Sequence, residues 1–322
     1  MTFKINPISG DASFRKFFRL KLNKKSKIII LAEKEKYKNL VVYASINKFL
    51  RANKIYAPKL YMYNFSKGII VIQDFGDNSF FNLLLKKKDK IGIYKKLVDL
   101  IIKIQKIKPI TRIKKVNKGY YKIKKYSNNQ LFKESDLFFD WYLPLFKNKK
   151  KSFEIKMKSK KILSRLYNSL NFPNSYFVHR DYHVHNLMKV NNRIGIIDSQ
   201  DSLIGNPSYD LASLIDDVRI KTSKKLKNDI YNYYLRKSPR IFRKNSKEFF
   251  QDFSILSVQR ILKIIGIFSR LYTRDKKSLY LKYIPYAWEI LEMRINSAFF
   301  SDLRLFLDSN IPKKLRKKII NK

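Results

Sequence analysis

The stretch from Phe177 to Asp201, FVHRDYHVHNLMKVNNRIGIIDSQD, constrains the fold and chemistry of this chain more than any other. It holds all three histidines of the 322 residues, then an apolar run that leads to Asp198. It also places an aspartate and an asparagine five positions apart, Asp181 and Asn186. This order predicts a loop followed by a hairpin, which gather a base and two oxygen ligands at one place. Phosphoryl transfer from a metal-bound nucleotide requires that arrangement.

Each polar side chain of the stretch has an expected role. Asp181 would accept or orient the proton of an attacking hydroxyl. Asn186 offers a neutral oxygen and Asp198 an anionic one, and both suit the hard Mg²⁺ ion. Asp201 could reach a second metal ion or only shape the turn. His179 is expected to brace the loop rather than to touch a substrate.

The histidines allow a rival interpretation as a metal hydrolase. His183 and His185 have a common metal-ligand spacing, and three histidines with aspartates could hold zinc or iron and activate water. The chain lacks the His-Glu-x-x-His pattern, however, and has no other histidine to complete a site. We therefore favour the phosphotransferase, in which His183 could contact the acceptor, although such loop histidines are more often simply exposed.

Composition excludes several classes of protein. The hydrophobic fraction of 45% is that of a folded globular protein, and the absence of cysteine excludes disulfides and thiolate metal sites. No apolar run is long enough to span a membrane, and the N-terminus lacks a signal-peptide pattern, which predicts a cytoplasmic protein. The charge of +46 would attract anionic substrates such as nucleotides. The lysines are spread along the chain with other residues of A/T-rich codons, so nucleic-acid binding is not the expected main function.

A small polar turn near the N-terminus is a candidate for contact with phosphate. Ser9–Arg15 precedes two apolar runs that read as strands, Phe17–Leu22 and Lys27–Leu31. A tight turn of small residues between strands lets backbone N–H groups approach an anion. Gly10 and Arg15 are therefore expected to bind the cofactor, and the alternative is an ordinary hairpin.

The chain is expected to form two lobes, residues 1–76 and 77–322. The first would be mostly β, with a helix at Lys38–Arg51 and a last strand at Ile69–Ile72. The Asp-Phe-Gly that follows precedes the catalytic stretch, whereas the magnesium-binding version must follow it. It is therefore expected to link the lobes and to contribute Asp74 to the nucleotide site. Apart from the central hairpin, the second lobe is expected to be helical, at Ser79–Leu85, Tyr94–Lys106, Asn129–Leu143, Ser159–Leu170, Pro207–Val218, Lys225–Leu235, Phe249–Tyr272 and Leu279–Phe299.

Four blocks of sequence, in order along the chain, carry a family resemblance. They read GDASFRKFFRL near the N-terminus, FFDWYLP at 138–144, HRDYHVHNLM with IIDSQDSLIGNPSYDLASLIDD, and VQRILKIIGIFSRLYTRDKKSLYL at 258–281. The chain resembles the aminoglycoside-phosphotransferase-like superfamily, small-molecule relatives of protein kinases. It is most similar to the bacterial cell-wall amino-sugar kinases, which phosphorylate the anomeric hydroxyl of N-acetylmuramate or N-acetylglucosamine.

The resemblance implies an α+β, two-lobed protein-kinase-like fold, with a small antiparallel β N-lobe, a larger helical C-lobe and ATP between them. It implies Asp181 as catalytic base, Asn186 and Asp198 as Mg²⁺ ligands, and Ser13 in the phosphate loop. Asp210, at the start of a helix, would support the catalytic loop, although the helix dipole explains a carboxylate there nearly as well.

Two departures from the family pattern affect the site. Protein kinases hold the phosphates with a lysine of the third strand. Here neither Lys34 nor Lys36 is in register, which leaves the phosphates to Mg²⁺, to loop N–H groups and to Arg15. The second departure is Ser199, where the branch usually has an aromatic residue.

The acceptor site is predicted on the helical lobe. A sugar needs polar groups for its hydroxyls and usually an aromatic face. Candidates are Glu134, Trp141, Gln259, Arg260 and Arg274, with Asp140 and Lys263 beside them. If the acceptor is a lactyl sugar such as N-acetylmuramate, an arginine or lysine should meet its carboxylate. The alternative for most of these residues is a place in the core.

The sequence thus predicts an ATP- and Mg²⁺-dependent kinase of a small-molecule hydroxyl, acting on an amino sugar in cell-wall recycling. Alternatives are an aminoglycoside- or choline-type kinase with another acceptor, and a kinase-like protein that binds a nucleotide or a partner without catalysis.

Overall fold

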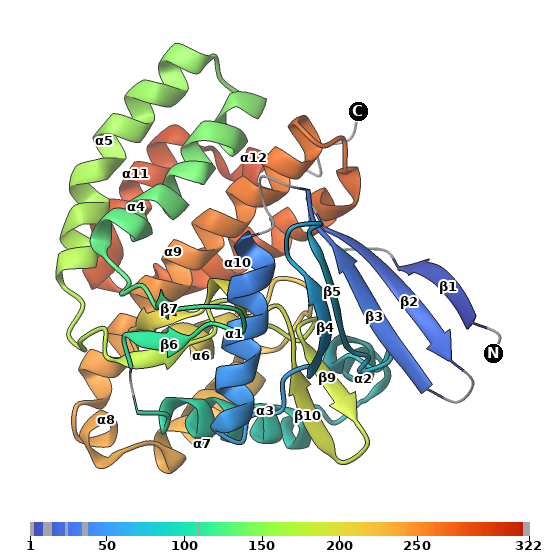
Figure 1. Ribbon diagram of the computed structural model, residues 1–322. Helices are drawn as coiled ribbons and strands as arrows, with labels where there is room; N and C mark the ends of the chain where they lie inside the picture. The colour runs from blue at the N-terminus through green and yellow to red at the C-terminus, as the bar shows by residue number, and fades with distance from the viewer. Residues whose placement is uncertain (1–2, 9–14, 23–24, 34–37, 109, 318–322) are drawn as a thin grey trace. The chain divides into compact units, whose positions relative to one another are not determined.

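A computed structural model describes residues 3–8, 15–22, 25–33, 38–108 and 110–317 (Figure 1). Contacts between residues divide the chain into two compact units. One unit consists of residues 1–124 and 175–204, and the other of residues 125–174 and 205–322. The predicted lobe boundary at residue 76 is defined by the end of the N-terminal sheet and not by contacts between residues. It therefore stays a prediction.

The first unit begins with a five-stranded antiparallel sheet in the order β1-β2-β3-β5-β4. Its strands are β1 (Phe3–Ile8), β2 (Lys16–Leu22), β3 (Lys25–Leu31), β4 (Leu60–Asn64) and β5 (Ile69–Gln73). Strands β2, β3 and β5 coincide with the stretches predicted as strands. Strand β4 was not predicted, and its side chains are mostly exposed.

Helix α1 (Lys38–Ala52) packs on this sheet. Alternate side chains of a strand point to the same face, and Ile30 of β3 is buried against Leu40 and Tyr43 of α1 and Ile70 of β5. The apolar residues of α1 recur at helical spacing, which is why its sequence predicted a helix.

The remainder of the first unit carries the catalytic stretch predicted from the sequence. Its elements are α2 (Phe80–Lys86), α3 (Ile91–Gln105), β6 (Arg112–Lys114), β7 (Tyr120–Lys122), β8 (Tyr176–Val178), β9 (Leu187–Val190), β10 (Arg193–Ile196), a 3₁₀ turn (Ser199–Asp201) and β11 (Leu203–Gly205). Strands β9 and β10 form the expected hairpin, with Gly195 opposite Met188. A Cβ atom at Gly195 would come within 2.5 Å of the Phe75 ring, so the hairpin needs a residue without a side chain there.

The second unit is helical. Its elements are α4 (Asn128–Leu137), a π-helical turn (Phe138–Tyr142), a 3₁₀ turn (Leu143–Leu145), α5 (Lys149–Asn168), α6 (Tyr209–Ile215), α7 (Lys224–Lys237), α8 (Arg240–Lys244), α9 (Ser246–Thr273), a 3₁₀ turn (Ser278–Tyr283), α10 (Ile284–Arg294), a 3₁₀ turn (Ala298–Phe300), α11 (Ser301–Asn310) and α12 (Lys313–Lys317). Helix α9 packs against α4, α6 and α10.

The antiparallel sheet and the mostly helical remainder confirm the predicted α+β fold class. Several details of the prediction are wrong. The single helix predicted at Leu279–Phe299 is α-helical only at Ile284–Arg294 and has 3₁₀ turns on either side. The helix predicted at Asn129–Leu143 changes to a π-helical turn after Leu137, and the region after residue 76 contains strands besides the hairpin, among them β6 and β7. These strands have three residues each, too short for an alternating pattern to be visible.

Candidate active site

A pocket of about 470 Å³ lies within the first unit, between the sheet and the catalytic stretch. Apolar side chains of the sheet, among them Ile30 and Ile72, line it together with Met188 and Ile197. Its polar lining consists of Arg15, Arg19, Asn39, Tyr43, Gln73, Asp74, Asp77, His185, Asn186, Asp198, Gln200 and Asp201. An apolar pocket with a group of polar side chains is typical of a small-molecule or cofactor site.

The amide group of Asn186 is oriented by the loop to which it belongs. Its Nδ2 atom donates to the carbonyl oxygen of Asp181 at 3.0 Å and lies 3.3 Å from Nε2 of His183. Because the loop engages the NH₂ side of the amide, its oxygen is available to a ligand in the pocket that Asn186 lines. A neutral oxygen of this kind suits a hard divalent cation.

The backbone at Asp198 is in the left-handed region, with φ 62° and ψ 41°. Arg180, in the loop predicted to be catalytic, also has a positive φ of 76°. Residues other than glycine rarely adopt this conformation, and it persists where the surroundings fix it.

The electrostatic environment of Asp198 favours a bound cation. The side chain is 45% exposed, and its exposed part lines the pocket. Partial burial of this carboxylate in the pocket wall, together with the negative charge of Asp181, raises the pKa of Asp198 to about 6, while Arg15 acts in the opposite direction. Two interacting carboxylates are a charge arrangement that a divalent cation relieves. The amide oxygen of Asn186 and the carboxylate of Asp198 therefore fit Mg²⁺, which takes one or two protein oxygens and completes its shell with phosphates and water.

Arg15 is the buried cation of the pocket. It is 6% exposed, its Nη1 atom lies 3.9 Å from Oδ1 of Asp198, and its guanidinium carbon lies 5.4 Å from the ring centre of Tyr43. The same Nη1 donates to Gln200 at 3.2 Å, and Gln200 donates to Asp198 at 3.0 Å. A guanidinium held in this way can meet a phosphate group.

The carboxylate of Asp74 is occupied by protein donors. It accepts hydrogen bonds from Nε of Arg19 at 2.6 Å and from the backbone N–H of Gly76 at 2.8 Å. Arg19 also binds Asp77, through two contacts of 2.8 Å. A contact between Asp74 and a nucleotide, which stays a prediction, would therefore come from its backbone.

The three histidines have different surroundings. Nε2 of His179, which is fully buried, donates to the carbonyl oxygen of Ile197 at 3.1 Å. The ring of His185 stacks on Phe81 with their centres 3.9 Å apart, and His183 lies beside Asn186. Among residues 3–317, apart from the undescribed positions, no three His, Asp or Glu side chains are arranged to hold a metal ion by themselves.

Part of the predicted phosphate-binding set cannot be placed. Gly10 and Ser13 lie outside the described residues, as do Lys34 and Lys36.

Three of the predicted acceptor residues are buried in the second unit. Glu134 accepts hydrogen bonds from Tyr126 at 2.6 Å and from Nε2 of Gln259 at 3.0 Å, and Lys263 lies 3.7 Å away. The guanidinium carbon of Arg260 lies 4.9 Å from the ring centre of Tyr209. Gln259 is fully buried and Glu134 is 6% exposed, so a contact between either residue and an acceptor, which stays a prediction, would require this region to open.

The other residues predicted for this lobe are separate from that group. Arg274 is exposed and pairs with its neighbour Asp275 at 2.7 Å. Trp141 is half-buried in the π-helical turn. Asp210 is buried in the first turn of α6, and its predicted support of the catalytic loop stays a prediction.

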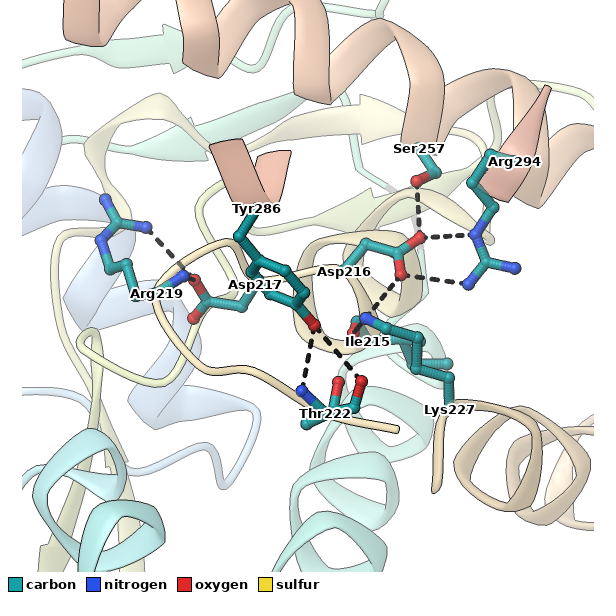
Figure 2. Close-up of polar contacts among 9 residues, drawn as sticks. All are labelled: Ile215, Asp216, Asp217, Arg219, Thr222, Lys227, Ser257, Tyr286 and Arg294. Carbon is teal, nitrogen blue, oxygen red and sulfur yellow. Dashed lines mark hydrogen bonds and ion pairs between the residues drawn. The ribbon is translucent and has the colours of Figure 1, made fainter. Parts of the chain in front are cut away.

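A buried ionic cluster in the second unit was not predicted (Figure 2). Asp216, at the end of α6, accepts hydrogen bonds from Arg294 at 2.8 and 3.0 Å, from Lys227 at 3.0 Å and from Ser257 at 2.6 Å. Lys227 also donates to the carbonyl oxygen of Ile215 at 2.6 Å, which caps the end of α6. Because the partners belong to α7, α9 and α10, this carboxylate ties four helices together.

Comparison with known proteins identifies the family. Residues 4–243 match the phosphotransferase enzyme family. The chain belongs to this family. It is an enzyme, and the predicted class, a small-molecule kinase, is confirmed.

Curated relatives place the chain near the predicted branch. It is 27% identical over 290 residues to the N-acetylmuramate/N-acetylglucosamine kinase of Neisseria meningitidis, covering 88% of this chain and 83% of that one. It is 26% identical over 274 residues to the N-acetylmuramate/N-acetylglucosamine kinase of Caulobacter vibrioides, covering 84% of this chain and 74% of that one.

Solved structures share the fold at low sequence identity. An aminoglycoside phosphotransferase with bound ADP has a TM-score of 0.58 at 13% identity, covering 90% of this chain and 92% of that one. A choline/ethanolamine kinase family protein from Mesorhizobium loti has a TM-score of 0.61 at 13% identity, covering 95% of this chain and 92% of that one. Within the described residues, no helix is both long and apolar enough to cross a membrane.

Proposed function

We propose that this kinase transfers the γ-phosphoryl group of ATP to the anomeric hydroxyl of an amino sugar, N-acetylmuramate or N-acetylglucosamine. The observation that carries the proposal is that Arg15, Asn186 and Asp198 line one apolar pocket, in a chain whose curated relatives bear the names of kinases for these two sugars. The product would belong to the recycling of cell-wall sugars.

The pocket supports ATP as the phosphoryl donor. Its apolar side, with the half-buried Phe17, Ile28 and Ile197, offers a surface for a nucleobase, and its polar side holds Arg15. Asn186 and Asp198 would hold Mg²⁺, which when bound neutralises charge on the phosphates.

The residues of the chain would act mainly by positioning and by proton transfer. The acceptor oxygen forms a bond to the γ-phosphorus while the bond from that phosphorus to the bridging oxygen of ADP breaks, without a covalent enzyme intermediate. Asp181 would take the proton that the hydroxyl releases. The hydrogen bond from Asn186 to the backbone of Asp181 holds the base and the metal ligand in one loop. Correct placement of the reacting groups supplies much of the rate.

The test is ADP release from ATP and Mg²⁺ with a panel of acceptors: N-acetylmuramate, N-acetylglucosamine, glucose, an aminoglycoside and choline. We expect turnover with the two amino sugars. Turnover with only glucose, the aminoglycoside or choline would agree with the assignment as a kinase but would refute the proposed acceptor. Silence with every acceptor would refute the proposed substrate class.

Two substitutions test the assigned roles. Asp181→Asn should lower kcat by about 10²–10⁴ while leaving nucleotide binding largely intact. Asp198→Ala should remove the Mg²⁺-dependent part of nucleotide binding. Asp229→Asn, an exposed carboxylate of α7, serves as the control. Turnover of Asp181→Asn within tenfold of the wild type, or unchanged metal-dependent affinity in Asp198→Ala, would refute the corresponding role.

A further inference from the structure

The left-handed backbone of Asp198 is fixed by hydrogen bonds on both sides. On the N-terminal side, the carbonyl oxygen of Ile197 accepts the bond from His179. On the C-terminal side, Oγ of Ser199 donates to Oδ1 of Asn47 at 2.6 Å, and Oγ of Ser202 donates to the carbonyl oxygen of Ser199 at 2.7 Å. A backbone conformation that is intrinsically unfavourable persists only where contacts of this kind over-determine it.

The contact between Ser199 and Asn47 is buried and joins two distant parts of the chain. Ser199 is fully buried and Asn47 is 1% exposed. Asn47 lies in the middle of α1, on a face that is otherwise apolar, with Tyr43 and Leu50 as buried neighbours on the same helix. Burial of polar groups is costly, and within the described residues Nδ2 of Asn47 has no hydrogen-bond partner, so the bond from Ser199 satisfies only the oxygen of this amide. Loss of that bond would leave a second buried polar atom unsatisfied, so the bond constrains where α1 and the turn after Asp198 can lie.

Helix α1 contacts the surroundings of Asp198 at a second point. The ring of Tyr43, one turn before Asn47, lies under the guanidinium of Arg15, and Arg15 pairs with Asp198. The helix carries no carboxylate in its sequence KNLVVYASINKFLRA. The hydrogen bond from Ser199, in the turn after Asp198, to Asn47 of this helix joins two neutral side chains.

We propose that Asn47 and Ser199 are positioning residues that aim the carboxylate of Asp198 into the pocket. The inference rests on the proposed function, in which Asp198 binds Mg²⁺ with the nucleotide. In this role the pair acts through the backbone of Asp198 and touches neither the metal ion nor the substrate. Residues that contact a metal ligand, but not the metal ion itself, change metal affinity by fixing the orientation of that ligand.

A purely structural role would give a different result. Loss of a buried hydrogen bond in an ordinary part of the core lowers stability without a specific change in metal dependence. Ser45 provides the matched control, because it is a fully buried serine of the same helix whose Oγ donates to the carbonyl oxygen of Val41 at 2.6 Å. It also accepts from the backbone N–H of Val116 at 3.1 Å.

The experiment compares Ser199→Ala, Asn47→Leu, the double variant, Ser199→Thr and Ser45→Ala with the wild type. For each full-length protein it measures the melting temperature, binding of ATP with Mg²⁺ and in EDTA, and amide hydrogen exchange of residues 197–202 without ligands. We expect Ser199→Ala and Asn47→Leu to raise the Mg²⁺ concentration at half-maximal ATP binding by about tenfold, and to speed exchange in this segment. The double variant should be no worse than either single variant, because both remove the same contact. Ser199→Thr, which keeps the hydroxyl, should restore most of the affinity.

The inference is overturned if Ser199→Ala has the Mg²⁺ midpoint and the exchange rate of Ser45→Ala. If Asn47→Leu does not fold, Ser199→Ala alone tests the inference. This substitution adds no volume to the buried site and is therefore expected to fold. Wild-type protein that binds ATP with Mg²⁺ but phosphorylates neither amino sugar would refute the proposed substrate and leave this comparison valid. Wild-type protein that does not bind ATP with Mg²⁺ would overturn both proposals.

Discussion

The Nε2 atom of His179 lies 3.1 Å from the carbonyl oxygen of Ile197, so the loop that holds Asp181 is hydrogen-bonded to the residue just before Asp198. The first prediction concerns this bond. His179→Phe keeps a buried ring but leaves that carbonyl without its donor, which should lower the free energy of unfolding by about 1–3 kcal/mol. Chemical denaturation measures this loss, and kcat/KM should fall as well because both loop segments are displaced. Wild-type stability in His179→Phe would contradict this account.

The second prediction concerns the pocket cation. Arg15→Met keeps an apolar side chain against Tyr43 but removes the charge next to Asp198. We expect the Kd for ATP with Mg²⁺ to rise about tenfold, equivalent to ~1.4 kcal/mol. Calorimetric titration measures it. Arg240→Met, an exposed arginine at the start of α8, is the control for loss of one positive charge in a chain of +46. Equal Kd values for the two variants would refute the prediction that Arg15 contacts the bound nucleotide.

The third prediction concerns the acid stability that comes from Asp216. Burial alone would raise the pKa of this carboxylate, but Lys227 and Arg294, with a hydrogen bond from Ser257, hold it far below its usual range. The unfolded-state pKa is about 3.9. The stabilisation is therefore fully present above that pH and is lost as the pH falls through the range below it.

Urea denaturation of the wild type and Asp216→Asn at several pH values tests this expectation. At pH 7 the variant should be less stable by about 3–5 kcal/mol, because two buried cations lose their partner. The difference between the two proteins should shrink as the pH falls below about 4. A difference that is independent of pH would contradict the ionic account, and Asp229→Asn controls for loss of an exposed carboxylate.

The fourth prediction concerns the close approach of α9 to the end of α4. A Cβ atom at Gly266 would lie 2.3 Å from the carbonyl carbon of Leu137 and 2.5 Å from the backbone nitrogen of Phe138. Gly266→Ala should therefore destabilise the protein by about 1–3 kcal/mol or more, although alanine favours helices. At Gly92, in the first turn of α3, nothing lies within 4 Å of the added atom. Gly92→Ala should be neutral or stabilising in the same thermal melts, and a similar loss in both variants would refute the steric explanation.

Local patterns predicted the parts of the fold that are determined locally. The β-branched run of β3, the periodic apolar residues of α1 and the spacing of Asp181 and Asn186 were all visible in the sequence. Ser199 was visible only as a departure from the family pattern. Its partner Asn47 is 152 positions away. The signal that could have identified Asn47 is a polar residue at helical spacing from the apolar Tyr43 and Leu50.

The buried cluster of the second unit escaped prediction for the same physical reason. The partners of Asp216 lie 11, 41 and 78 positions along the chain. No short pattern links residues at such separations. Among the acceptor candidates, the sequence could not distinguish Gln259, which is fully buried, from Arg274, which is exposed on the same stretch.

The unit that holds the pocket is discontinuous, because it joins residues 1–124 to residues 175–204. Ribosomes synthesise a chain from its N-terminus at about 5–20 residues per second. The sheet therefore leaves the ribosome well before the segment that carries Asn186 and Asp198. During that interval the apolar side chains that line the pocket from the sheet, among them Phe17 and Ile28, lack the segment of residues 185–201 that lines the pocket opposite them. We expect the nascent chain to be most prone to aggregation, and most dependent on chaperones, until residue 204 has emerged.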